Sequence, residues 1–104
     1  MDIIRIMTDW VTEISLGEVK CGLLKEGSND ASFRSTVSHL NRTYFYKKGW
    51  AVHVRSFWRD NAVGIACVSR KDFDEHKNDS TYENEWQCKI DNAYYREQQT
   101  KKSR

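Results

Sequence analysis

The chain contains no proline among its 104 residues, so no ring interrupts a helix and no proline-rich linker separates domains. It has no apolar run near the ~20 residues that a membrane-spanning helix needs. Its first fifteen residues are too rich in charge for a secretory signal. These absences, with the short length, predict one cytoplasmic domain without a membrane partner.

Cysteine and glycine are also scarce, and neither is arranged as a reactive motif. Cys21, Cys67 and Cys88 form no C-x-x-C pair, and an odd number of isolated cysteines is typical of buried, reduced thiols. The cysteines and the three histidines show none of the spacings of a zinc site. The five glycines are isolated, so no phosphate-binding loop is present. We therefore expect no metal, no cofactor and no enzymatic activity.

Aromatic residues and unevenly distributed charge are what the sequence does contain. Four Trp, five Tyr and four Phe can fill a small core. The net charge is only +2. However, residues 32–71 carry eight Lys and Arg against one Asp, whereas residues 1–31 have a net charge of −3 and residues 72–98 a net charge of −5. This block pattern indicates one bounded basic surface between two acidic segments.

Hydrophobic periodicity predicts helices over residues 2–15 and Ala31–Tyr46, with a strand over Glu18–Leu24 between them. A short strand over residues 2–7, followed by a helix capped at Thr8 or Asp9, is the alternative for the first segment. The second helix has the clearer apolar stripe, which consists of Phe33, Val37, Leu40 and Tyr44. We expect Gly17 and Gly49 to end the two helices.

The segment after Gly49 alternates with period two and predicts a β-hairpin. Trp50, Val52, Val54 and Trp58 are expected on the core side of the first strand. With Asp60-Asn61 as a two-residue turn, the return strand is Ala62–Arg70, and Trp58 pairs with Val63 while Phe57 covers Gly64. An acidic loop over Lys71–Thr81 then leads to a last amphipathic helix, Tyr82–Gln98.

The expected fold class is therefore α+β, in the order α-β-α-β-β-α, as a three-stranded antiparallel sheet with helices on one face. Residues 1–98 form the single domain, and residues 99–104 are expected to be a disordered basic tail.

The basic surface supplies the candidate site. Clustered Lys and Arg bind phosphate, and a helix followed by a hairpin is also how a winged DNA-binding domain ends. A second mode would use the hairpin face as a platform, with Phe57 and His53 stacking on bases. The candidate nucleic-acid-binding residues are Arg34, His39, Arg42, Lys47, Lys48, His53, Arg55, Phe57 and Arg59.

Four short stretches carry a resemblance: Leu16-Gly17-Glu18-Val19, Phe33-Arg34-Ser35, Lys48-Gly49-Trp50 and Val54-Arg55. Over residues 16–70 this pattern resembles small phage-encoded accessory proteins. The resemblance implies a DNA-binding regulator or an inhibitor of a host defence system, of which anti-CRISPR proteins are one example. The expected partner is accordingly nucleic acid, more specifically DNA, or alternatively a host protein, and either reading allows a homodimer.

Overall fold

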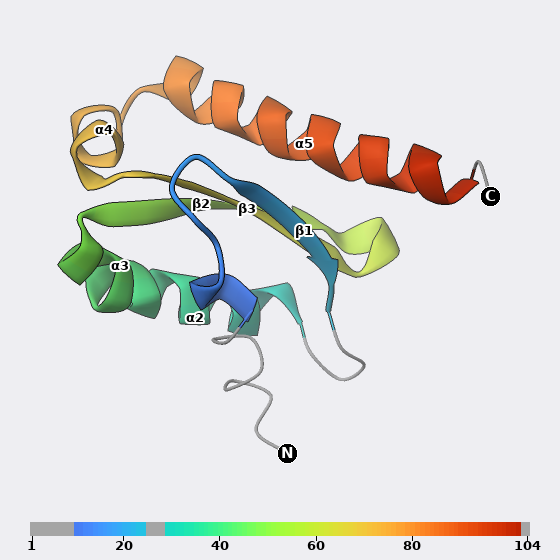
Figure 1. Ribbon diagram of the computed structural model, residues 1–104, viewed down its shortest axis with the longest axis horizontal. Helices are drawn as coiled ribbons and strands as arrows, with labels where there is room; N and C mark the ends of the chain where they lie inside the picture. Colours follow the sequence, from blue (N-terminus) through green and yellow to red (C-terminus); the bar gives the residue numbers. More distant parts are fainter. Residues whose placement is uncertain (1–9, 25–28, 103–104) are drawn as a thin grey trace.

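A three-stranded antiparallel sheet lies between two helical layers in the computed structural model, which describes residues 10–24 and 29–102, with side chains up to residue 99 (Figure 1). The strands are β1 (Val19–Leu23), β2 (Trp50–Phe57) and β3 (Ala62–Ser69), in the spatial order β1-β3-β2. The predicted α+β class and antiparallel sheet are confirmed.

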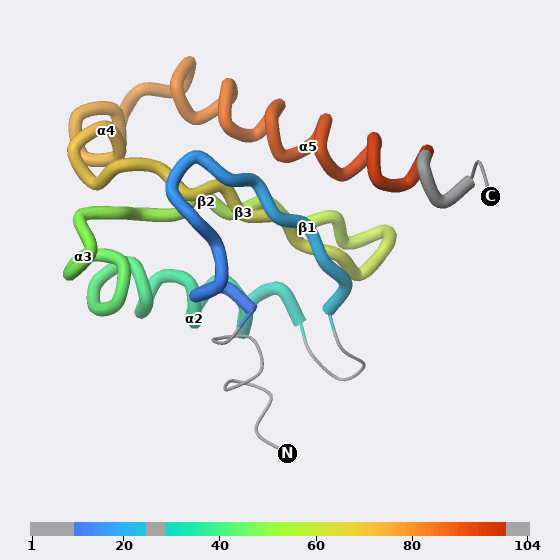
Figure 2. Tube along the Cα trace, viewed as in Figure 1, coloured from blue at the N-terminus to red at the C-terminus, as the bar shows by residue number. Residues whose placement is uncertain are grey.

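Helices cover both faces of the sheet, whereas the sequence predicted them on one face only. Helices α2 (Asp30–Arg42) and α3 (Tyr44–Lys48) lie against one face, and α5 (Ser80–Lys102) runs along the other (Figures 1 and 2). Helix α4 (Arg70–Glu75) leads into α5. The central strand β3 is buried at every position from Ala62 to Val68 because it is covered on both faces.

Most of the first predicted helix, residues 2–15, lies outside the described residues. Within the part that the structure describes, residues 10–12 are helical. Two other segments are more helical than predicted. Residues 70–75 form α4 instead of strand end and loop, because the Ser69 hydroxyl caps the helix by accepting a hydrogen bond from the Asp72 N–H (3.1 Å). Helix α5 includes residues 99–102, which were predicted to be tail.

Helix α2 buries the predicted stripe of Phe33, Val37 and Leu40. Its N-terminus is capped by Asn29, whose side chain accepts a hydrogen bond from the Ser32 N–H (2.8 Å). The helix breaks at Thr43, and α3 continues to Gly49, which has a positive φ of 76°. On an unbroken helix Phe45 would point away from the stripe, but the break places Phe45 fully inside the core.

The hairpin register differs from the predicted one by two residues. Phe57 pairs with Ala62 and Val54 with Ile65, because Trp58–Asp60 form a 3-10 turn (η1) and Asn61 adopts a left-handed conformation with φ of 50°. The connection therefore has four residues instead of two. A shift of two keeps each side chain on its predicted face of the strand, but it removes Trp58 from the core and leaves it 87% exposed.

Candidate nucleic-acid interface

The exposed side of α2 carries basic and small polar side chains and is opposite the buried stripe. Arg34, Ser35, Ser38, His39 and Arg42 are all exposed. The Arg42 guanidinium donates a hydrogen bond to the Ser38 hydroxyl (2.9 Å) one turn earlier. The only acidic residue of α2 is Asp30, in its first turn. This surface therefore offers cations and hydroxyl donors with one carboxylate at its end.

Two lysines extend this surface at the end of α3. Lys48 Nζ lies 4.6 Å from the centre of the Tyr44 ring and 4.8 Å from that of Trp50, so its stem packs on aromatic faces while the residue remains exposed. Lys47 is exposed beside it. We call the exposed basic residues of this layer the basic face: Arg34, His39, Arg42, Lys47 and Lys48.

Arg34 joins the basic face to the hairpin. Its Nε donates a hydrogen bond to the Ser56 hydroxyl (3.2 Å) and lies 3.8 Å from the Asp30 carboxylate. The Ser56 hydroxyl in turn donates to Asp30 (3.3 Å). Arg34 is therefore partly neutralised and has a structural role as well as an exposed charge.

The two helical layers have opposite charge. Residues 30–48, which form α2 and α3, contain four Lys and Arg and one acid, whereas residues 70–99 contain five Lys and Arg and eight acids. The sheet separates α5 from α2 and α3 (Figure 1). Most carboxylates of α5 therefore lie across the sheet from α2 and α3. Helix α4 begins beside α3, where the Arg70 N–H donates to the Gly49 carbonyl (2.8 Å), and Glu83 lines the same hollow as Arg34.

Three of the nine candidate residues lie under α5 and are not available as a platform. His53 is 5% exposed. Arg55 forms an ion pair with Asp91 (2.9 Å), and Phe57 stacks on Tyr94 at 4.2 Å between ring centres. The prediction that His53 and Phe57 stack on bases from an open hairpin face is wrong, because α5 packs on this face of the sheet and covers both rings.

His53 is enclosed by aromatic rings and one carboxylate. Its ring is parallel to that of Trp86 at 5.9 Å and within 5.4 Å of the rings of Tyr82 and Phe73. Nδ1 lies 3.2 Å from Glu83, while Nε2 is buried without a hydrogen-bond partner among the described residues. Burial lowers the pKa of His53 below its ordinary value, and this effect outweighs the opposing effect of Glu83.

Acidification should therefore destabilise the fold. The unfolded chain takes up a proton at His53 near pH 6.5, whereas the folded protein takes it up only at lower pH, so the free energy of unfolding falls as the pH drops below about 6.5. His53→Phe should remove this part of the pH dependence, which urea unfolding of both proteins between about pH 7 and pH 5 measures. The same slope in both proteins would contradict the assignment.

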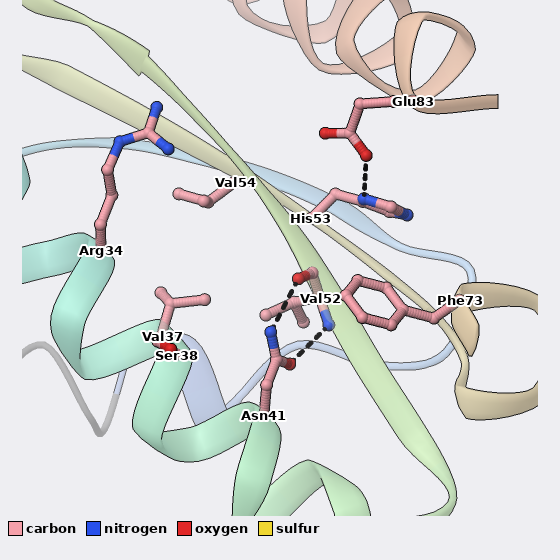
Figure 3. Close-up of a pocket in the computed structure, with 9 residues that line it drawn as sticks. All are labelled: Arg34, Val37, Ser38, Asn41, Val52, His53, Val54, Phe73 and Glu83. Atoms are coloured by element: carbon pink, nitrogen blue, oxygen red, sulfur yellow. Dashed lines mark hydrogen bonds and ion pairs between the residues drawn. The ribbon is translucent and has the colours of Figure 1, made fainter. Parts of the chain in front are cut away.

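The outer edge of β2 is occupied by an asparagine from α2. Asn41 Nδ2 donates to the Val52 carbonyl (3.1 Å), and Oδ1 accepts from the Val52 N–H (2.9 Å), so this amide replaces a neighbouring strand (Figure 3). Gln87 donates to the Val54 carbonyl (3.3 Å). A hollow of about 290 Å³ lies along this edge. Another strand cannot pair with β2 at Val52, because both backbone groups of Val52 already form hydrogen bonds with Asn41.

Asn41→Asp should lower the free energy of unfolding by about 1–3 kcal/mol. The carboxylate retains the acceptor for the Val52 N–H but loses the donor, and it sets an oxygen against the Val52 carbonyl. Chemical denaturation measures the change. Asn84→Asp is the matched control, because Asn84 is exposed in the second turn of α5. Equal effects of the two substitutions would contradict the bridging role of Asn41.

The remaining candidate, Arg59, lies in the hairpin turn beside a residue that the sequence analysis assigned to the core. Trp58 and Arg59 are both exposed, and with the end of α5 they line a hollow of about 460 Å³. We call this the tip hollow, which is lined by Phe57, Trp58, Arg59, Asp60, Tyr94 and Tyr95. The sequence predicted a two-residue turn, whereas four residues connect β2 and β3, and this longer connection places Trp58 outside the core.

The described residues contain no group of three or more His, Cys, Asp or Glu that could hold a metal ion. Burial raises the pKa of Cys21 and Cys67 to about 11, which keeps both thiols protonated at neutral pH. Within the same residues, no helix is both long and apolar enough to cross a bilayer. Comparisons of the chain with protein-family models, curated proteins and solved structures found no match.

Proposed function

We propose that this protein binds nucleic acid, specifically DNA, through the basic face and without catalysing a reaction, as a regulator of phage or plasmid type in the cytoplasm. The observation that carries this proposal is the separation of charge between the two helical layers. Five of the nine candidate residues, Arg34, His39, Arg42, Lys47 and Lys48, lie on one layer and are exposed.

The dimensions and side chains of α2 suit a DNA groove. Its 13 residues span about 20 Å, and an α-helix fits the major groove, which is about 12 Å wide. Ser35 and Ser38 are short enough to let the helix approach the duplex, and hydroxyl groups are common donors to phosphate oxygens. Arg42, Lys47 and Lys48 would then supply phosphate contacts.

The hairpin lies where a wing would extend the contact. Arg34 ties α2 to Ser56 near the end of β2, so Arg59 in the following turn is held at a fixed position relative to the helix. A helix that enters a groove with an adjacent hairpin over the backbone is a recurring arrangement in DNA recognition.

Amide chemical shifts mapped with a DNA duplex test this proposal directly. We expect the largest shifts in α2, α3 and the turn at Arg59, and small shifts along the outer surface of α5 at Cys88 and Asn92. Shifts confined to α5, or no shifts at low ionic strength, would contradict it.

A second candidate function is a non-catalytic inhibitor of a host defence protein, of the anti-CRISPR kind. The acidic layer formed by residues 70–99 favours it, because a basic protein surface would be complementary to this layer. Capture from a bacterial lysate separates the two functions. A stoichiometric protein partner that survives nuclease treatment supports the inhibitor, and recovery that depends on nucleic acid supports the DNA-binding protein.

A further inference from the structure

The tip hollow is unusual because it exposes aromatic rings that the core does not use. Trp58 is 87% and Tyr95 59% exposed, although large aromatic side chains are normally well buried. Both line the same hollow of about 460 Å³. Grouped exposed aromatic rings at the mouth of a hollow mark an interaction site more often than single exposed apolar residues do.

The inner wall of the tip hollow is rigid. Phe57 and Tyr94 are stacked with centres 4.2 Å apart and planes 14° apart, and Tyr95 meets Tyr94 edge-on at 5.6 Å. The Tyr94 hydroxyl donates a hydrogen bond to the Asp60 carboxylate, which fixes α5 to the turn at Tyr94. The inner wall of the hollow is therefore formed before any ligand binds, and binding of a flat ligand does not require these side chains to become ordered.

The charges at the tip hollow are one cation and one anion. Arg59 is exposed and has no ion-pair or hydrogen-bond partner among the described residues, so it is available to an anionic group. Asp60 accepts one hydrogen bond from Tyr94 and can accept another from an amino group. A matching ligand has a flat ring, a negative charge and an amino-bearing edge, which are the features of a nucleotide.

We propose that the tip hollow binds one unpaired base of a nucleic acid, so that the protein prefers DNA in which a base is extruded or single-stranded. The base stacks on Trp58 and Tyr95, its phosphate lies at Arg59, and an amino group of adenine, guanine or cytosine donates to Asp60. This inference rests on the proposed function and adds the class of ligand that the basic face alone does not define.

The hollow and the basic face are connected through the hairpin. Arg34 at the start of α2 contacts Ser56, which directly precedes Phe57 in the wall of the hollow. Ser56 and Phe57 point to opposite faces of β2, so the basic face and the tip hollow meet at the end of this strand, where Arg59 follows in the turn. The combination of exposed aromatic rings with the cation of Arg59 favours nucleic acid as the occupant over an apolar protein side chain or a second copy of the chain.

The test compares three DNA duplexes that differ at one position: fully paired, with one bulged guanine, and with an abasic site in the bulge. The abasic duplex retains the backbone distortion and lacks only the base. Stacking of one base on aromatic side chains predicts about tenfold tighter binding of the guanine bulge than of the abasic bulge. Trp58→Ala should abolish this difference and leave binding of the paired duplex unchanged, and Trp58→Phe should retain part of it.

The outcomes are distinguishable. Equal binding of the guanine and abasic bulges would overturn the assignment of the hollow while the proposed function stands. Loss of binding to all three duplexes in the wild-type protein would overturn both proposals. Self-association that Trp58→Ala abolishes, measured by sedimentation without DNA, would assign the hollow to a second copy and overturn this inference. Trp58 is almost fully exposed, so its replacement should leave the fold intact.

Discussion

Replacing Arg42, Lys47 and Lys48 together by alanine should weaken binding of a DNA duplex on the order of 100-fold at about 0.1 M salt. Each of these side chains is exposed on the basic face, and each lost phosphate contact forfeits the release of a counterion. Fluorescence anisotropy with a labelled duplex measures the affinity. Circular dichroism checks that the fold persists, since Lys48 also packs on Tyr44 and Trp50.

The matched control removes the same number of positive charges from the opposite layer. Lys77, Lys89 and Arg96 are exposed in or beside α5, and their replacement by alanine changes the net charge from +2 to −1, as does the first variant. We expect this control to change the affinity less than about threefold, because its charges lie across the sheet from the basic face. An equal loss in both variants would show that overall charge, not the basic face, determines binding.

Gly64→Ala should destabilise the fold by about 2–3 kcal/mol, because the added methyl group has no room between β3 and α5. A Cβ atom at this position would lie 2.3 Å from Ile90 Cγ2 and 3.2 Å from Cys21 Sγ. Ile90 is fully buried, so α5 must move away from the sheet to relieve the contact. Thermal unfolding should show a decrease in Tm of about 10 °C or more for a chain of this length.

Ile90→Leu provides the compensating change, because leucine has the same number of atoms but no methyl branch at Cβ. The double variant Gly64→Ala, Ile90→Leu should regain at least 1 kcal/mol relative to the sum of the single changes. Additive effects of the two substitutions would contradict a direct steric contact between Gly64 and Ile90.

Local signals in the sequence were sufficient to predict α2 and the identity of the strands. The stripe of Phe33, Val37 and Leu40 has helical spacing, and Gly49 ends the helical segment with a positive φ. The break at Thr43 was not predictable from periodicity. In a continuous helix Tyr44 would extend the buried stripe, and after the break Phe45 takes that place in the core. Packing against the sheet, which lies outside the local sequence, decides between the two rings.

The candidate site was predicted only in part, because local periodicity determines some of its residues and packing determines the others. The exposed residues Arg34, His39 and Arg42 lie where the period of α2 places them, whereas Lys47 and Lys48 follow the break at Thr43 and are exposed because α3 buries Phe45 instead. The residues His53, Arg55 and Phe57 alternate correctly along β2, but period two does not say which face another element will cover. Helix α5 has a narrow apolar stripe, and its docking over His53 became visible only in three dimensions.

The salt dependence of DNA affinity shows whether the basic face binds the DNA backbone, because counterion release reports the number of phosphates that this face contacts. With the four Lys and Arg of the basic face engaged, a plot of log K against log salt concentration should have a slope of about −3.6, and the Arg42, Lys47, Lys48 triple alanine variant should reduce its magnitude by about 2.7. A slope near zero in the wild-type protein, or the same slope in both proteins, would contradict DNA binding through the basic face.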